Sequence, residues 1–320
     1  MEKTFRSTFG YKAFRIAVTV LVGVLLFAAL TKLCQPKYYF VLESKSPETE
    51  MWKSFYGLER DSLDILFLGS SHIYNSIDPE QFEERTGLRG FDMSTSNQDA
   101  SLSYYLLRET LRYQKPKTVV MDLYGLQLEP MTKESSYKRT LDDMRWSCNK
   151  LEVIQTWLPH MEGETLLPRL FTLLDYHGRW NDLTDADING KAYITSRRGF
   201  CPTDETAEGI THDKYFSDEE EHAFSETTLD YMRSIIELCR QNGMELILIK
   251  TPDTGWTAKW SEAARSLAGH YSLPYTDFNE PELLPEINLD DTTDWRNANH
   301  LNSRGAVKFT DYLADYLNSI

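Results

Sequence analysis

The chain has 320 residues, of which 41% are apolar and 26% are charged, and this is the composition of a globular protein rather than of a disordered or fibrous one. A formal net charge of −15 argues against a nucleic-acid partner, because phosphate binding needs a basic surface. Four widely spaced cysteines, with no Cys-x-x-Cys pair among them, favour neither a disulfide scaffold nor a zinc site.

The first predicted element is an apolar segment at residues 14–33, with the sequence FRIAVTVLVGVLLFAALTKL. Sixteen residues without a charge lie between Arg15 and Lys32, whose long side chains can reach toward the membrane surface. About 20 residues can then cross a hydrocarbon core of roughly 30 Å. Basic residues predominate before this segment, so the positive-inside rule places residues 1–13 in the cytoplasm. The sequence predicts a single-pass protein of the cell membrane with an extracytoplasmic main domain.

Three other interpretations of this segment fit the residues less well. A cleaved signal peptide needs a small-residue cleavage site, and the following TKLCQPKYYF offers none. A lipoprotein modified at Cys34 needs small residues before the cysteine, where this chain has Leu-Thr-Lys-Leu. A buried core helix is normally amphipathic, whereas this segment is apolar on all sides.

The predicted extracytoplasmic domain covers residues 61–320 and follows a stalk at residues 34–60. Short apolar runs are typical of strands buried on both faces, and five occur, at residues 64–69, 90–93, 118–124, 245–250 and 274–278. Helical patterns alternate with them at residues 101–113, 226–241, 257–270 and from residue 303 onward. This alternation predicts an α/β fold of three layers, α/β/α, in which helices cover both faces of a doubly wound, mainly parallel, flavodoxin-like sheet.

The strand pattern is interrupted between residues 126 and 225, which we interpret as a mostly helical insertion beside the sheet. Within it, His177, Arg179 and Trp180 form an aromatic and basic cluster that could serve as a platform for a sugar. An equally simple interpretation places Trp180 in the core of the insertion.

Polar side chains follow the predicted strands at the edge where an open parallel sheet binds its ligands. Gly-Ser-Ser-His at residues 69–72 follows the first strand, a loop of small polar residues at 94–98 follows the second, and Asn-Ala-Asn-His at 297–300 precedes the last helix. A serine nucleophile needs a neighbouring base, and an acyl-transfer intermediate needs N–H donors for its oxyanion. These residues therefore predict nucleophilic acyl transfer by Ser71 and His300.

Together these motifs resemble the SGNH (GDSL-type) hydrolase superfamily. The likeness is greatest to its membrane-anchored bacterial branch, which is similar to proteins that esterify teichoic acid with D-alanine or O-acetylate envelope polysaccharides. The resemblance covers residues 60–125 and 225–320. It implies a serine acyl hydrolase (an esterase) or O-acyltransferase that acts on a cell-envelope polysaccharide or related ester, through an acyl-enzyme and without a cofactor. The acyl donor would come from a separate membrane-bound protein, because only one span is predicted here.

The resemblance also implies roles for individual residues. Ser71 matches the nucleophile and His300 the base. Ser94 stands at the position of the oxyanion glycine, and its backbone N–H would act with that of Ser71. Asn97 could replace the oxyanion asparagine, because no Gly-x-Asn-Asp block follows the third strand.

This sequence departs from the family pattern at the acid, because Asn297 stands where an Asp is expected three residues before the His. An asparagine can hold the imidazole tautomer but cannot stabilise an imidazolium with a charge. Asp294, Asp291 or Asp290 could substitute, or the pair could act as a Ser–His dyad. The alternative is a non-catalytic, SGNH-like binding or assembly subunit of an envelope-modification complex.

Two further residues near this edge have a structural and a functional interpretation. His72 could pack near the first helix or contact substrate, and Lys250 could line the pocket or simply end a strand before a proline turn. The acidic residues 290–294 lack the spacing of a calcium loop, so no metal is expected. A nucleotide-binding flavodoxin-like protein is disfavoured, because the first loop lacks a Walker lysine and a G-x-G-x-x-G run.

Overall fold

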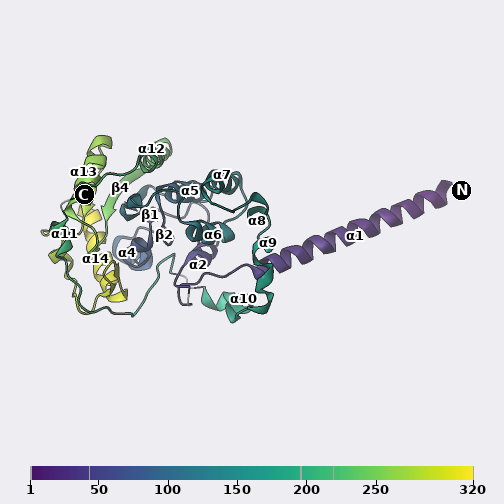
Figure 1. The fold of residues 1–320 in the computed structure, drawn as a ribbon, viewed down its shortest axis with the longest axis horizontal. Coiled ribbons are helices and arrows are strands. Elements are labelled where there is room, and N and C mark those ends of the chain that lie inside the picture. Colours follow the sequence, from purple (N-terminus) through teal and green to yellow (C-terminus); the bar gives the residue numbers. More distant parts are fainter. Residues whose placement is uncertain (1, 43, 195–196, 219, 320) are drawn as a thin grey trace. The chain divides into compact units, whose positions relative to one another are not determined.

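The computed structural model describes the chain except for residues 1, 43, 195–196, 219 and 320. By its internal contacts the chain divides into two compact units, both drawn in Figure 1. Unit 1 comprises Met1–Lys37 and Glu162–Tyr193, and unit 2 comprises Tyr38–Met161 and Ile194–Ile320.

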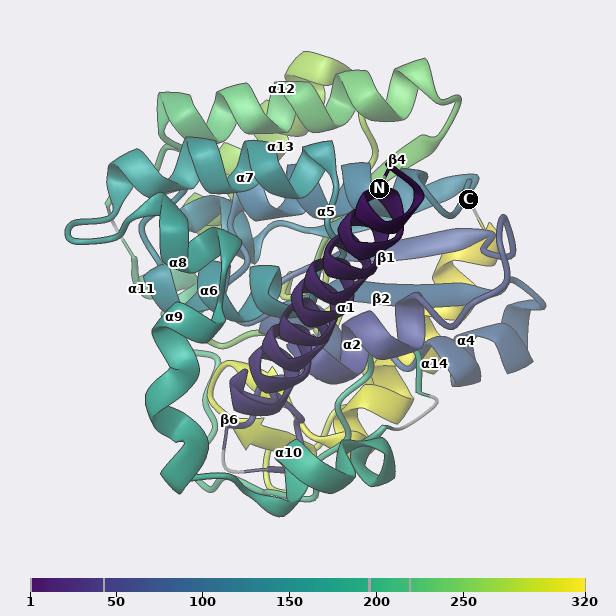
Figure 2. The same ribbon diagram turned by 90° about the vertical axis from the view of Figure 1, so that its right-hand side faces the viewer.

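Unit 2 is built on a sheet of five parallel strands in the order β2-β1-β3-β4-β5. Figures 1 and 2 label β1, β2 and β4 of this sheet. The strands are β1 (Ile65–Gly69), β2 (Gly90–Ser94), β3 (Thr118–Asp122), β4 (Glu245–Lys250) and β5 (Tyr275–Asp277). All five lie at the predicted segments. Because β2 and β3 lie on opposite sides of β1, the winding direction changes at β1, and such a switch point is where open α/β sheets bind ligands.

Helices cover both faces of the sheet, which confirms the predicted three-layer fold. Alternate residues of a strand point to opposite faces, so Leu66 and Leu68 belong to one buried cluster and Ile65 and Phe67 to the other. The first cluster includes side chains of α2 (Glu48–Phe55), α5 (Ala100–Leu111), α12 (Glu226–Gln241) and α13 (Ala258–Tyr271). The second includes side chains of α4 (Pro79–Thr86) and α14 (Ser303–Ser319). Apolar residues on both faces explain why the strands are continuous apolar runs.

The other elements of unit 2 are short or lie beside the sheet. They are the helices α3 (Ser71–Tyr74), α6 (Glu134–Asp143), α7 (Cys148–Trp157) and α11 (Lys214–Ser217), the 3-10 helices η1 (Tyr124–Gln127), η2 (Leu158–His160) and η5 (Leu284–Ile287), and an antiparallel ribbon of β6 (Trp295–Asn297) and β7 (His300–Leu301).

The predicted stalk at residues 34–60 differs from the structure, because it contains α2 and contributes to the core. Met51, Trp52 and Phe55 are buried in the first cluster. The indole of Trp52 donates a hydrogen bond of 2.7 Å to the carbonyl of Thr140 in α6. The sequence of α2 is short and its partner is more than 80 residues away, so no local pattern revealed this packing.

The predicted insertion at residues 126–225 is also divided differently. Helices α6 and α7 belong to unit 2, where Tyr137 and Trp157 stack with ring centroids 5.5 Å apart. After unit 1, the chain returns along the edge of β2, and the N–H of Asp92 donates to the carbonyl of Arg198 over 2.9 Å. Only residues 162–193 leave unit 2.

Unit 1 combines the N-terminal helix α1 (Glu2–Cys34) with α8 (Leu166–Leu170), α9 (Leu173–Tyr176), α10 (Asp185–Asn189) and the 3-10 helices η3 (His177–Asn181) and η4 (Gly190–Tyr193). The stretch Gly10–Cys34 of α1 is long and apolar enough to cross a membrane. Its side chains are largely exposed, as expected for a helix without an amphipathic face.

Candidate active site

Ser71 and His300 are joined by a hydrogen bond beside the switch point of the sheet. Ser71 is the first residue of α3 and follows β1 after a single residue. His300 begins β7, and the loop before it is held by Thr254, whose hydroxyl donates to the carbonyl of Ala298 over 2.8 Å. The Ser71 hydroxyl lies 2.8 Å from His300 Nε2. The structure thus brings together two side chains that are 229 positions apart in the chain.

Asn297 determines which nitrogen of His300 carries the hydrogen. Its Oδ1 lies 2.9 Å from His300 Nδ1 and also accepts the N–H of Asn299 over 2.9 Å. A peptide N–H can only donate, so the atom that faces it must be the amide oxygen. His300 Nδ1 therefore donates to Asn297, and its Nε2 presents a lone pair to the Ser71 hydroxyl. This is the tautomer that a general base needs.

The surroundings of His300 keep its imidazole neutral. The pKa of His300 is lowered to about 3, mainly by burial and further by the charges of His72, Arg296 and Lys250, which Asp253 partly opposes. A neutral imidazole at neutral pH can accept the serine proton. Asn297 adds no negative charge that would stabilise the imidazolium formed in that step.

His72 lies behind the pair and is 1% exposed. Its ring stacks on Tyr124 with centroids 3.8 Å apart and lies 4.8 Å from the ring of His300. Its Nδ1 is 3.2 Å from the Ser70 hydroxyl, and its Nε2 is 3.1 Å from Asp253 Oδ2. In this structure His72 packs beneath the site, and a contact of this residue with substrate stays a prediction.

Lys250 is fully buried below the same site, and a role of this residue in lining a pocket stays a prediction. Its ammonium lies 3.4 Å from Asp253 Oδ2 and 3.6 Å from Asp122 Oδ2, and it donates to the Thr251 carbonyl over 2.9 Å. Burial alone raises the pKa of Asp253, but the charges of Lys250 and His72 and the hydrogen bonds to the carboxylate outweigh it and lower the pKa well below its usual range. A buried layer of compensating charges therefore supports His72.

Sequence reasoning missed Asp122, Tyr124 and Asp253 in this layer. Asp122 ends β3 and Asp253 lies three residues beyond β4, so both stand at the strand ends where ligands gather. Their position after apolar runs was the available signal. An Asp in such a loop is also a common turn residue, however, so the pattern did not distinguish a functional carboxylate from an ordinary turn.

Asp294 is engaged away from His300. Its carboxylate accepts from Lys308 Nζ over 2.6 Å, from the N–H of Asp290 over 2.8 Å and from the hydroxyl of Thr293 over 2.9 Å. Because His300 Nδ1 faces Asn297, Asp294 is not the group that orients the imidazole in this structure. Its bonds instead hold the loop that leads into β6.

The loop at residues 94–98 contains the two residues predicted for the oxyanion. Ser94 ends β2 and is buried, and its hydroxyl donates to the Asp92 carboxylate. Asn97 is exposed with a φ of 51°, and the neighbouring Ser96 N–H donates to Glu48 of α2 over 3.1 Å. Helix α2 thus helps to hold this loop. The oxyanion roles of Ser94 and Asn97 stay predictions.

His177, Arg179 and Trp180 belong to unit 1, whereas Ser71 and His300 belong to unit 2. Arg179 pairs with Asp187 over 3.0 Å. Trp180 is 68% exposed, so it is not a core residue of the insertion. A role of this cluster in sugar binding stays a prediction.

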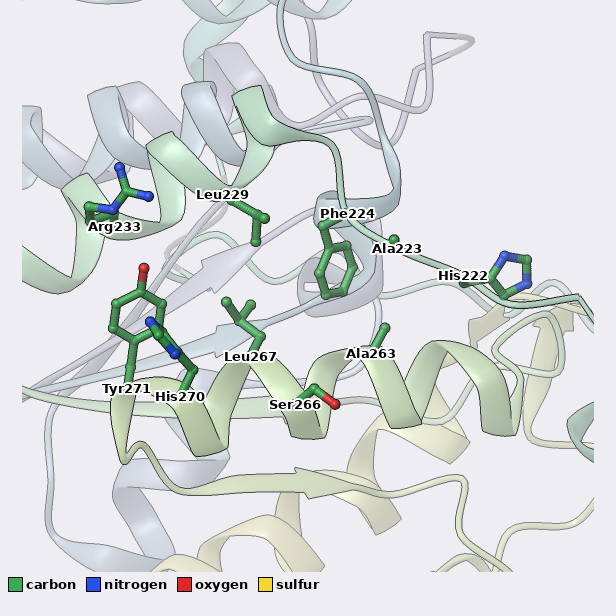
Figure 3. Close-up of a pocket in the computed structure, with 10 residues that line it drawn as sticks. All are labelled: His222, Ala223, Phe224, Leu229, Arg233, Ala263, Ser266, Leu267, His270 and Tyr271. Atoms are coloured by element: carbon green, nitrogen blue, oxygen red, sulfur yellow. The ribbon is translucent and has the colours of Figure 1, made fainter.

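Figure 3 shows a separate pocket of unit 2, between α12 and α13. It has a volume of about 440 Å³, and its lining includes the apolar side chains of Phe224, Leu229 and Leu267. None of the predicted site residues lines it. Among the residues that the structure describes, no group of His, Cys, Asp and Glu side chains is arranged to hold a metal ion.

Comparison with known proteins finds distant structural likenesses only. No protein-family model and no curated protein matches the sequence. A proposed acylhydrolase of Bacteroides fragilis is similar with 10% identity and a TM-score of 0.39, over 89% of this chain and 99% of that one. A proposed GDSL-like lipase of Parabacteroides merdae is similar with 12% identity and a TM-score of 0.34, over 82% and 98%. Likenesses this low carry no argument, so the case for function rests on the residues of this chain.

Proposed function

We propose that unit 2 is a serine acyl hydrolase or O-acyltransferase of the SGNH type. The observation that carries this proposal is the continuous chain of hydrogen bonds from the Ser71 hydroxyl through His300 to Asn297. It supplies a nucleophile, a neutral base in the required tautomer and a group that orients the base. The buried layer behind the pair provides rigid support.

The reaction would proceed in two balanced steps. Ser71 Oγ attacks the acyl carbonyl while its proton passes to His300 Nε2, and the same proton then leaves with the departing alcohol. In the second step, water or an acceptor hydroxyl gives its proton to His300 and attacks the acyl-enzyme, and His300 returns that proton to Ser71 Oγ as the acyl–serine bond breaks. The N–H groups of Ser71 and Ser94 and the side chain of Asn97 would hold the oxyanion.

The proposed substrate is a cell-envelope polysaccharide or a related ester. The support for it is the apolar stretch of α1, which would anchor the enzyme in the cell membrane beside an extracytoplasmic polymer. A separate membrane-bound protein would deliver the acyl donor if the enzyme is a transferase. Because both reactions share one acyl-enzyme, the same residues serve hydrolysis and transfer.

The test is covalent labelling of the full-length protein in detergent with a serine-directed fluorophosphonate, followed by intact mass, together with turnover of p-nitrophenyl acetate. We expect one label on the wild type and none on Ser71→Ala, with strongly reduced labelling of His300→Ala. Ser266→Ala and His270→Ala are matched controls, because both side chains are exposed on α13 and should leave labelling unchanged.

Labelling of the wild type that survives Ser71→Ala would contradict the proposed nucleophile. A folded wild type that neither labels nor turns over substrate would favour the second candidate, a non-catalytic subunit that binds an envelope glycan. The neutral Asn297 in place of an acid is the observation that favours this candidate.

A further inference from the structure

Exposed large apolar side chains are concentrated in the part of unit 1 that lies outside α1. Helices α8 to α10 and the segments that connect them carry six of these side chains within about two dozen residues, each with more than a third of its surface exposed. They are Leu166, Leu167, Phe171, Leu174, Trp180 and Ile188, and we call this set the apolar collar. A high density of large exposed apolar side chains outside a membrane span is unusual and points to an interaction site.

The collar is attached to the C-terminal end of α1. The ring of Phe171 meets that of Phe27 edge to face with centroids 6.0 Å apart. Arg179 Nη1 donates to the carbonyl of Cys34, the last residue of α1, over 2.6 Å. Figures 1 and 2 show α9 and α10 beside this end of the helix.

The contact with Phe27 sets the depth of the collar. Lys32 is the charged residue at this end of the apolar stretch, so it marks the border of the hydrocarbon core. Phe27 precedes Lys32 by five residues, which is about 7 Å along a helix, and it therefore lies inside that border. Phe171 packs against Phe27, so it must reach a similar depth.

The charged groups of this segment are compatible with such a position. Arg169 pairs with Asp175 and Glu164, and Arg179 pairs with Asp187, so both guanidinium groups are neutralised within unit 1. Between residues 162 and 193 acidic side chains outnumber basic ones. The collar therefore suits uncharged lipid better than an anionic lipid surface.

We infer that the apolar collar is a second membrane-contacting element, which inserts into the lipid interface around the outer end of α1. The chemistry of the partner is that of the acyl chains and glycerol region of a zwitterionic bilayer. Trp180 is suited to this region because an indole combines an apolar body with an N–H donor. The collar would fix unit 1 at the membrane surface in addition to the span itself. This inference rests on the proposed membrane anchoring by α1.

The test uses the full-length protein reconstituted into phosphatidylcholine vesicles with and without lipids brominated on the acyl chain. Bromine quenches tryptophan only on contact, so we expect part of the emission to be lost in the brominated vesicles. Trp180→Phe should remove most of this loss, whereas Trp146→Phe should not. Trp146 is the matched control, because it is also exposed, at 51%, but belongs to unit 2. Adding Ile188→Trp to Trp180→Phe should restore the quenching.

Two outcomes would overturn the inference. One is unchanged quenching in Trp180→Phe. The other is a blue-shifted Trp180 that lipid bromine does not reach, which would show that a protein or a second copy covers the collar. Flotation of the vesicles tests anchoring by α1 separately. Protein that floats with the vesicles but shows no quenching of Trp180 is anchored by α1, while its apolar collar does not contact lipid. Fluorophosphonate labelling of Ser71 in detergent tests the chemistry independently of both.

Discussion

At the scale of single residues, Asn297 determines how the imidazole of His300 is oriented toward Ser71. It accepts hydrogen bonds from His300 Nδ1 and from the N–H of Asn299, so the orientation of the imidazole is secured without a carboxylate. What is missing is a negative charge that would stabilise the imidazolium in the transition state. The site is therefore built as an oriented dyad.

Asn297→Asp is predicted to raise turnover, because Asp keeps both hydrogen bonds and adds the missing charge. An opposite charge at this distance raises the pKa of the imidazole by about 1–3 units. If the transition state gains about 1.4 kcal/mol, turnover increases about tenfold. The measurement is the pH profile of kcat for p-nitrophenyl acetate. Asn299→Asp adds the same charge without replacing the partner of Nδ1, and an equal gain in that control would refute the explanation.

Lys250→Met is predicted to destabilise unit 2 strongly. The substitution removes a fully buried ammonium that lies beside two buried carboxylates, Asp122 and Asp253. Breaking a buried ion pair in this way typically costs about 3–5 kcal/mol of unfolding free energy. Urea denaturation of the two proteins in detergent gives the value. Lys259→Met, which breaks surface ion pairs on α13, should change stability little, and equal stability of the two variants would contradict this role of Lys250.

At the scale of elements, the site depends on loops that are held by parts of the chain distant in sequence. The turn after β3 and the loop after β2 touch at Gly125, where an added Cβ would clash with the carbonyl oxygen of Gln98. The close approach of these two backbones shapes the rim on which Asn97 is exposed.

Gly125→Ala is predicted to destabilise the protein by about 1–3 kcal/mol, because one of two buried backbones must move. Gly269→Ala is the matched control: it lies in α13 with open space around its Cβ and an ordinary helical position, so it should be neutral or slightly stabilising. Thermal unfolding compares the two. Equal melting temperatures would contradict the prediction, because they would show that the backbone around Gln98 can move without loss of stability.

At the scale of the whole molecule, the dependence of stability on pH reflects two kinds of titratable group, which favour folding in opposite directions of pH. Burial is the main cause that raises the pKa of Asp92 and of Glu48, so the folded state binds the extra proton and these groups favour folding at lower pH. His300 acts in the other direction. Its folded pKa of about 3 lies below the ordinary value of 6.5, so between these pH values the unfolded chain binds more protons. The contribution of His300 to the free energy of unfolding is therefore fully present above pH 6.5 and is lost as the pH falls toward 3.

His300→Gln is therefore predicted to be less sensitive to acid than the wild type. Protonation of His300 in the unfolded chain alone lowers the unfolding free energy of the wild type by about 1–2 kcal/mol between pH 7 and pH 5. The urea midpoints of the wild type and the variant at pH 7 and pH 5 isolate the effect of His300, because Asp92 and Glu48 are present in both proteins. If the wild type and the variant lose the same stability, His300 is not a low-pKa group in the folded protein.

The division into two units also belongs to this scale. All the residues of the Ser71 site and its buried layer lie in unit 2, and the apolar helix lies in unit 1. The segment 162–193 belongs with α1 although it is far from it in sequence, because Phe171 and Arg179 contact Phe27 and Cys34.

Much of this organisation could be predicted from local patterns. Strands β1 to β5, helices α5, α12, α13 and α14, and the apolar helix α1 each repeat apolar residues at their own period or in one uninterrupted run. The order of these patterns implies the parallel sheet, and the sheet implies which loops share an edge. The polar residues at this edge include Ser71 and His300, and the resemblance to a known hydrolase family singles out these two residues and Asn297.

Other features depend on contacts between distant parts of the chain. Helix α2 cannot be recognised from its own sequence, because its apolar residues are buried only when α6 packs against them. The sequence places Lys250 at the end of a strand but does not reveal its buried charge partners, because β3 brings Asp122 beside it only in the folded protein. Burial and electrostatic pairing are properties of the folded state, which a linear pattern does not contain. Local order along this chain thus follows from its sequence, whereas the choice of partners for its charges and helices arises from long-range packing.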